Sequence, residues 1–160
     1  MSLSVLADVL AFVGHVALAL WFGSIIFLGF VTAPALFGGL PRVEAGRVMA
    51  IIFPAYYRFG TACGASIVLS AALRALFAGP SALQGSLLVV VSAMLALTIY
   101  AWRSLLPKVE QARRRAGAAD PTEEAFDRTY FLRLHAHSMR INIMIMALGL
   151  LGLWVAWLSG

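Results

Sequence analysis

The chain has 160 residues, of which 62% are hydrophobic and 12% charged, and its formal net charge is +5. Soluble domains average about 25% charged residues, so this composition excludes an ordinary soluble domain. The basic residues adjoin apolar runs, so attraction to anionic lipid headgroups explains the positive charge more simply than nucleic acid does. The expected partners are therefore the lipid bilayer and its anionic headgroups, and not nucleic acid.

Four apolar runs follow one another along the chain. Each approaches the roughly 20 residues that a helix needs to cross a hydrocarbon core of about 30 Å. They cover residues 9–33, 59–77, 82–102 and 141–158. The pattern predicts an all-α, integral membrane four-helix bundle that forms a single transmembrane domain over residues 1–160. Its helices are expected at residues 5–36, 42–78, 82–116 and 121–158.

The basic residues lie almost entirely on one side of these four crossings. Eleven of the twelve Lys and Arg residues occur in the linkers at residues 34–58 and 103–140, and only Arg74 lies toward the other face. Basic loops favour the cytoplasm. We therefore predict a protein of the bacterial inner membrane with cytoplasmic linkers and with both termini outside.

Proline and glycine residues divide the first half of the chain. Pro34 and Gly38-Gly39 are expected to break the first helix near its inner end, and Pro54 is expected to bend the second. Gly79-Pro80-Ser81 predicts a tight turn, which makes the second and third helices antiparallel neighbours.

The third and fourth helices are predicted to continue beyond the membrane. Asp120-Pro121-Thr122-Glu123 is a favourable helix start, with Asp as N-cap and Pro at the first position. A helix over residues 121–158 would be about 57 Å long, nearly twice the hydrocarbon core. Its first part should pair with the end of the third helix as a long cytoplasmic helical extension. Two interpretations stay open: a docking element for a partner, or a hairpin that only connects two crossings.

One short segment is repeated in the sequence. Residues 40–47 read LPRVEAGR and residues 106–113 read LPKVEQAR, an offset of 66 residues. A repeat in one orientation would relate the two helix pairs by an axis along the membrane normal. Duplication and convergence both remain open, because Pro followed by acidic and then basic residues is favourable at any helix start.

The three histidines are the first candidates for chemistry, because ionisable groups within a membrane are costly and often functional. His15 belongs to the outer part of the first helix, whereas His135 and His137 lie at the inner edge of the fourth. An offset of about 24 Å prevents the two levels from sharing one metal or one haem iron. The sequence holds no metal cluster, phosphate loop or catalytic triad, so we assign no catalytic or metal-binding residue and favour a protein that is not an enzyme.

A polar stripe along the fourth helix predicts a pocket. His135, Ser138 and Asn142 share one helix face, and Tyr57 and Arg58 come at a similar depth. These residues predict a polar and aromatic pocket that opens inward and takes a small ligand or a lipid headgroup, with Arg58 meeting an anionic group. The alternative is an interfacial belt that anchors the helices.

His15 and Trp21 lie deep in the first helix. An indole N–H near the middle of a membrane needs an acceptor, so Trp21 is expected to contact another helix. His15 is predicted to be a helix-packing histidine bonded to Ser66, Ser70 or Ser92.

Three stretches of the chain carry a family resemblance. The segments HVALALWFGSIIFLGFVTAPALFGGLPR, FPAYYRFG and RLHAHSMRIN are similar to the family of transmembrane protein 205-like domains, whose function is unassigned. This resemblance covers almost the whole chain. It points to His15, Pro34, Arg42, Pro54, Tyr57, His135, Ser138 and Asn142 as positions of interest, which adds Arg42 to the candidate ligand-binding residues.

The first helix alone resembles a second group of proteins. Its His…Trp-x-Gly pattern looks like that of CopD-type copper-resistance proteins and HemJ-type protoporphyrinogen oxidases. Those likenesses imply two alternatives to a ligand-binding membrane protein of unassigned activity. One is a haem b, porphyrin or redox protein with His15 as the cofactor ligand, and the other is a copper-handling protein. A homo-oligomer or a membrane partner stays open under each alternative.

Overall fold

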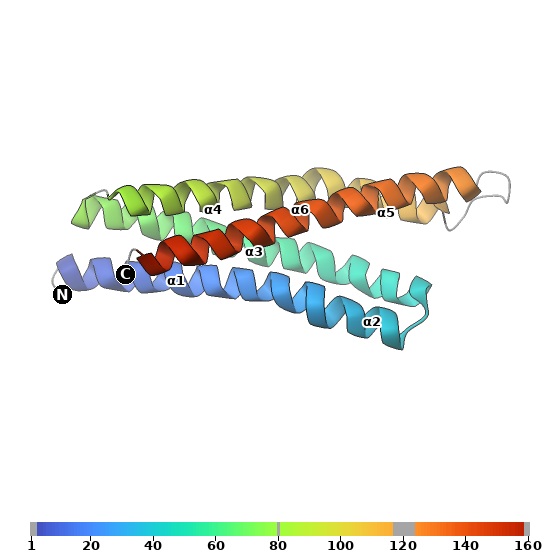
Figure 1. Cartoon of the computed structure of the whole chain (residues 1–160), viewed down its shortest axis with the longest axis horizontal. Coiled ribbons are helices and arrows are strands. Elements are labelled where there is room, and N and C mark those ends of the chain that lie inside the picture. The colour runs from blue at the N-terminus through green and yellow to red at the C-terminus, as the bar shows by residue number, and fades with distance from the viewer. Residues whose placement is uncertain (1–2, 80, 117–123, 159–160) are drawn as a thin grey trace.

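The computed structural model describes residues 3–79, 81–116 and 124–158, and every regular element in these ranges is a helix. Four helical arms run antiparallel along one another (Figure 1), as the sequence predicts. The first arm comprises α1 (Leu3–Phe27), a π-helical turn η1 (Leu28–Thr32) and α2 (Ala33–Gly39). The second arm is α3 (Arg42–Ala78). The third comprises α4 (Ala82–Tyr100), a second π-helical turn η2 (Ala101–Leu105) and α5 (Leu106–Ala116), and the fourth is α6 (Glu124–Leu158).

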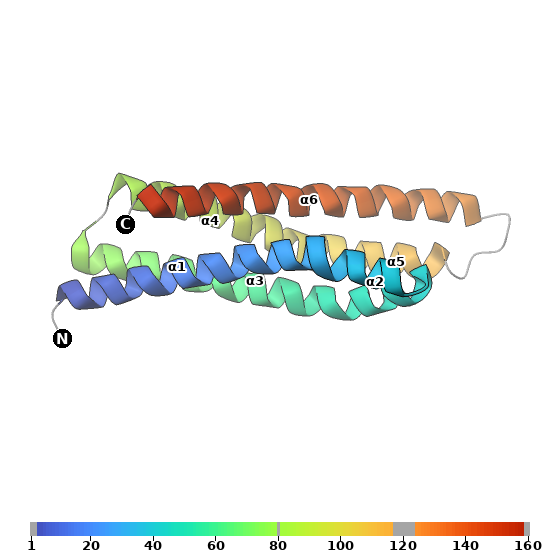
Figure 2. The ribbon, with the colours of Figure 1, turned by 60° about the horizontal axis from the view of Figure 1, so that its bottom comes forward.

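The arms form a ring in which each contacts two neighbours. The first arm packs along α3, α3 along α4, α4 and α5 along α6, and α6 returns to α1 (Figure 2). The start of α1, the end of α6 and the junction of α3 with α4 lie at one end of the bundle, which we call the outer end (Figure 1). The opposite end, where α2 and α5 lie, is the inner end. α5 pairs with α6, as the sequence predicts, and the position of this pair in the cytoplasm stays a prediction. The predicted helix start at Asp120–Glu123 falls outside the residues that the structure describes.

Neither internal proline of the first two arms ends its helix, contrary to the break expected at Pro34. Pro34 follows η1, in which the Ala33 N–H bonds to Leu28 O, and the arm continues to Gly39. Proline lacks an N–H and its ring crowds the carbonyl four residues earlier, so one wider turn accommodates it. The second π turn is likewise followed by Pro107. Pro54 lies inside the continuous α3.

Most of the largest buried side chains lie where the four arms meet in the outer and middle part of the bundle. Trp21 is completely buried, and an added Cβ at Gly60 would lie 2.6 Å from its Nε1 atom. The predicted contact of Trp21 with another helix is therefore confirmed, because Gly60 and Gly64 of α3 let the indole lie flat on that helix. Other completely or almost completely buried side chains are Leu18, Tyr57, Ile67, Val91, Met94, Thr98 and Ile145.

The surface of the bundle is largely apolar. Large side chains such as Phe12, Leu76 and Leu150 are 67%, 79% and 62% exposed. Such a surface is unfavourable in water but suits lipid. Four helices are long and apolar enough to cross a membrane, and they cover Leu3–Gly39, Arg42–Phe77, Ala82–Arg115 and Arg128–Leu158. These findings indicate an integral membrane protein.

Candidate functional site

A groove runs along one side of the bundle, between the first arm and α6. Its inner compartment has a volume of about 390 Å³ and is walled by α2, α3, α5 and α6. Its middle compartment, of about 310 Å³, is walled by α1, η1, α3 and α6. Gly29, Ala33, Met49 and Met139 line both compartments, so the two adjoin one another along the groove. Figure 1 shows the first arm and α6 diverging toward this end.

The spacing between α1 and α6 is set by residue size. In the outer half, a Cβ added at Gly149 of α6 would lie 2.7 Å from the ring of Phe22, so the two helices touch there. Toward the inner end α6 instead presents Met139 and Met146 to the groove. A Cβ added at Gly29 on the opposite wall would meet nothing within 4 Å. The groove therefore opens where the glycine contacts stop.

The inner compartment holds an ion-pair cluster. Arg113 donates to Glu110 through Nε at 2.9 Å and Nη2 at 2.8 Å, and Arg114 Nε donates to the same carboxylate at 2.9 Å. Glu110 and Arg113 line the compartment and pair with each other, whereas Arg114 lies outside it with its side chain 77% exposed. His135 lies on the facing wall, with its ring stacked on Phe131 at 5.9 Å. This end of the groove therefore presents a carboxylate, a guanidinium group and an imidazole.

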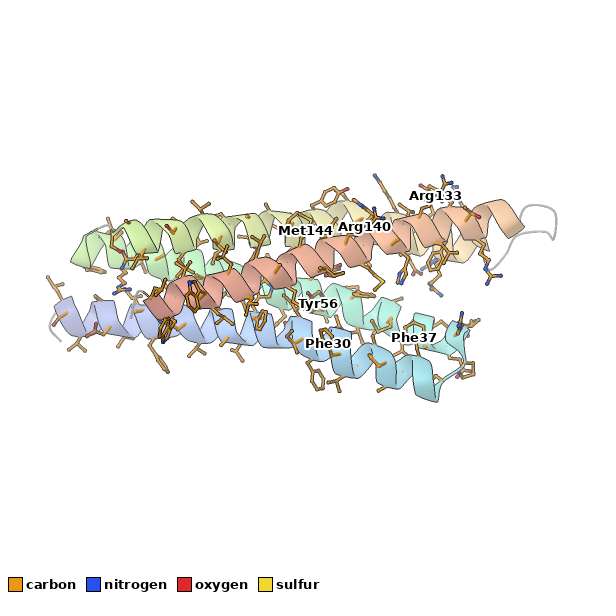
Figure 3. The ribbon with its side chains drawn as sticks, in the orientation of Figure 1. Phe30, Phe37, Tyr56, Arg133, Arg140 and Met144 are labelled. Carbon is orange, nitrogen blue, oxygen red and sulfur yellow. The ribbon has the colours of Figure 1, made fainter. Side chains whose placement is uncertain are left out.

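The middle compartment carries Tyr56 and Asn142. Figure 3 shows Tyr56 in the space between α6 and the first arm. No described residue forms a hydrogen bond with its hydroxyl. Asn142 Nδ2 donates to the Ser138 carbonyl at 3.2 Å, and its Oδ1 is buried without a hydrogen-bond partner among the described residues. A largely apolar wall with a few polar groups is typical of a ligand site.

Four of the six predicted site residues come together. His135 lines the inner compartment and Asn142 the middle one. Tyr57 is 2% exposed, and its hydroxyl lies near the side chains of Asn142 and Ser138. The side chains of Tyr57 and Ser138 therefore meet across the interior of the bundle, behind the groove.

Arg42 and Arg58 are separated from the other four. Arg42 is the exposed first residue of α3, and it lines neither compartment. Arg58 is also exposed, and its Nε donates to the Pro54 carbonyl of its own helix at 3.3 Å. Tyr57 points into the core, and consecutive residues of a helix point about 100° apart, so Arg58 is directed to the outside.

The pattern along the fourth helix did not reveal the opposite wall of the inner compartment. That wall includes Met49 and Phe53 of α3 and the Glu110–Arg113 pair of α5. A signal was present in the sequence, because Glu110 precedes Arg113 and Arg114 by three and four residues, the spacing of helical ion pairs. The spacing does not say which side of α5 faces the groove.

His15 lies at the other end of the bundle. Its Nε2 contacts the Ala156 carbonyl at 3.4 Å, so its partner is the end of α6 and not the predicted Ser66, Ser70 or Ser92. The adjacent cavity is about 40 Å³ and is shared with Ser70 and Arg74. Ala156 follows His135 by 21 residues of helix, or about 31 Å. His15 and His135 are therefore at separate sites.

No group of three His, Cys, Asp or Glu side chains within the described ranges could hold a metal ion. A model of one protein family matches residues 16–118, a range that extends from α1 to the end of α5. Its description is "domain of unknown function (DUF4149)". The chain belongs to this family. The finer resemblances to transmembrane protein 205-like domains and to CopD-type and HemJ-type proteins are not confirmed. No curated protein matches the chain, and no solved structure does.

Membership of the DUF4149 family supplies no reaction or ligand. The matched range contains α2, α3 and α5, and therefore three of the four walls of the inner compartment. The α6 wall, with His135 and Asn142, lies beyond it.

Proposed function

We propose that this DUF4149 member is a non-enzymatic protein of the bacterial inner membrane that binds a small amphiphile or lipid headgroup in its groove. Both termini are outside and the basic linkers are cytoplasmic, as the distribution of Lys and Arg predicts. The observation that carries the proposal is the groove, whose walls are largely apolar and whose inner compartment adds the paired side chains of Glu110 and Arg113.

The arginines on the outer surface support a position for the groove relative to the membrane. Arg58, Arg103 and Arg140 are exposed, and each lies about 20 residues from the outer end of its helix. Twenty residues span the hydrocarbon core, so these arginines mark its inner boundary. Figure 3 shows Arg140 and Arg133 on one edge of α6. The middle compartment then lies at the boundary, and the inner compartment lies in the headgroup region.

Haem and copper are weaker alternatives. The cavity beside His15 is about 40 Å³, compared with about 390 Å³ for the inner compartment of the groove. A porphyrin would require that end of the bundle to open. The groove needs no such rearrangement, because it is already connected to the lipid side.

Filling the groove tests the proposal. Gly29→Leu adds a side chain to both compartments, whereas Gly85→Leu adds the same side chain to α4, where an added Cβ meets nothing within 4 Å. We expect native mass spectrometry of protein incubated with bacterial polar lipids to show bound lipid for the wild type and for Gly85→Leu. Gly29→Leu should retain about tenfold less, while melting as the wild type does. Equal retention by all three proteins would refute the proposal.

A further inference from the structure

A second cavity, separate from the groove, lies toward the outer end of the bundle. It has a volume of about 40 Å³ and lies between α1, α3 and α4. A water molecule needs about 10–15 Å³ of such space, so the cavity has room for a small ion but not for a lipid headgroup. Its polar side chains are those of His15, Ser70, Arg74 and Gln84, and no acidic residue of the described ranges lines it.

The Ser70 hydroxyl faces this cavity. Ser66 and Ser86 each donate to the carbonyl four residues earlier in their own helix, at 2.9 and 3.1 Å. Ser70 is only 6% exposed, yet it forms no such bond within the described part of the chain. The facing position on α1 is Gly14, where an added Cβ would lie 3.8 Å from the Ser70 Cβ. Buried hydroxyls are normally hydrogen-bonded, so this side of the cavity calls for an acceptor.

Arg74 adds an uncompensated positive charge to the cavity. The side chain is half-buried, and it donates through Nε and Nη1 to the Gln84 amide oxygen, at 3.1 Å each, in the amide orientation that satisfies both groups. That amide is neutral. The ion pairs of the described residues are those of Glu110 at the inner end, and the exposed Asp8 of α1 is not among them. A partly buried guanidinium group without a counter-ion favours a negatively charged ligand.

The cavity lies close to the outer surface of the membrane. His15, which lines it, contacts the Ala156 carbonyl two residues before the end of α6. Trp154 and Trp157, which flank Ala156 in the sequence, are 59% and 72% exposed. Exposed tryptophans near a helix end are typical of the boundary between lipid and water. Anions in the aqueous phase on that side can therefore reach this level.

We infer that this cavity binds a monovalent anion of the size of chloride from the aqueous phase at the outer end. The Ser70 hydroxyl and the Arg74 guanidinium group both donate to the anion, and Gln84 holds the guanidinium group in place. One cation lines the cavity, so one negative charge neutralises it. The inference is independent of the proposed function, because the cavity and the groove share no lining residue.

Binding of radioactive chloride to detergent-purified full-length protein, measured by scintillation proximity, tests the site. We expect saturable binding to the wild type, which bromide and nitrate displace and the larger gluconate and phosphate do not. Ser70→Ala should weaken the affinity about tenfold, as expected for one hydrogen bond to a charged group, and Arg74→Gln should abolish binding. Ser66→Ala and Arg58→Gln are the matched controls on α3, because both side chains are exposed and bond to their own helix.

Melting temperatures in sodium gluconate show whether each variant folds. Exchange of gluconate for chloride at constant ionic strength should raise the melting temperature of the wild type but not that of Arg74→Gln, because a ligand stabilises only a protein that binds it. Wild-type protein without saturable chloride binding would overturn the inference, and so would equal losses of affinity in Ser70→Ala and Ser66→Ala.

Two further outcomes place the anion. Displacement of chloride by phosphate as readily as by bromide would mean that Arg74 meets phosphate groups at the membrane surface, and the assignment to the cavity would be wrong. Gly29→Leu, which fills the groove, should bind chloride as the wild type does. Loss of chloride binding in that variant would overturn the separation of the two sites.

Discussion

The outer and inner halves of this bundle are built from the same four arms, yet one is closed and the other is open. In the outer half, glycines at the contacts let α3 and α6 approach the side chains of α1 directly. In the inner half, methionine and phenylalanine side chains face a groove, and Arg113 also lines it. Helix spacing in a membrane depends on the size of the contact residues, so a few glycines decide where a site can form.

The largest expected effect concerns which half faces the cytoplasm. If the basic half is inside, green fluorescent protein fused after Gly160 should be dark and alkaline phosphatase fused there should be active. The same reporters fused after Ala116, at the basic end, should behave in the opposite way. Bright fluorescence at Gly160 with inactive phosphatase would reverse the assignment of the two halves.

The closed half should be sensitive to one added methyl group. Gly60→Ala places a Cβ 2.6 Å from Trp21 Nε1, in a contact with no room for it. Overpacking of this kind lowers the free energy of unfolding by about 1–3 kcal/mol. Gly23→Ala is the control, because an added Cβ there meets nothing within 4 Å. Equal thermal stability of the two variants in detergent would mean that the indole contact does not hold the closed half together.

The smallest effect is expected in the open half. Glu110→Gln removes the carboxylate shared by Arg113 and Arg114, whose side chains are 29% and 77% exposed. Exposed ion pairs contribute only about 0.2–1 kcal/mol, so the melting temperature should fall slightly. The difference between variant and wild type should shrink in 1 M salt, where exposed charges are screened. A fall as large as that of Gly60→Ala would show that this cluster holds the open half together.

The helices could be predicted from the sequence because length, apolar content and charge together determine where a chain can cross a membrane. The π turns could not be predicted, because Pro34 alone does not distinguish a broken helix from a widened one. One wall of the groove could be predicted from the sequence, because the spacing of His135 and Asn142 places them on one face of α6. The other walls depend on which sides of α3 and α5 face inward. That is set by contacts such as Trp21 on Gly60, between residues far apart in the chain.

The two π turns offer a second way to align the first half of the chain with the second half. Leu28 and Ala101, where they begin, are 73 residues apart, and so are Pro34 and Pro107. The repeated segment instead pairs Pro41, which precedes α3, with Pro107, which lies within a continuing arm. An alignment of the two halves by backbone geometry therefore differs by seven residues, close to two helical turns, from an alignment by residue identity. A test for duplication of the two halves should therefore use the alignment in which their π turns coincide.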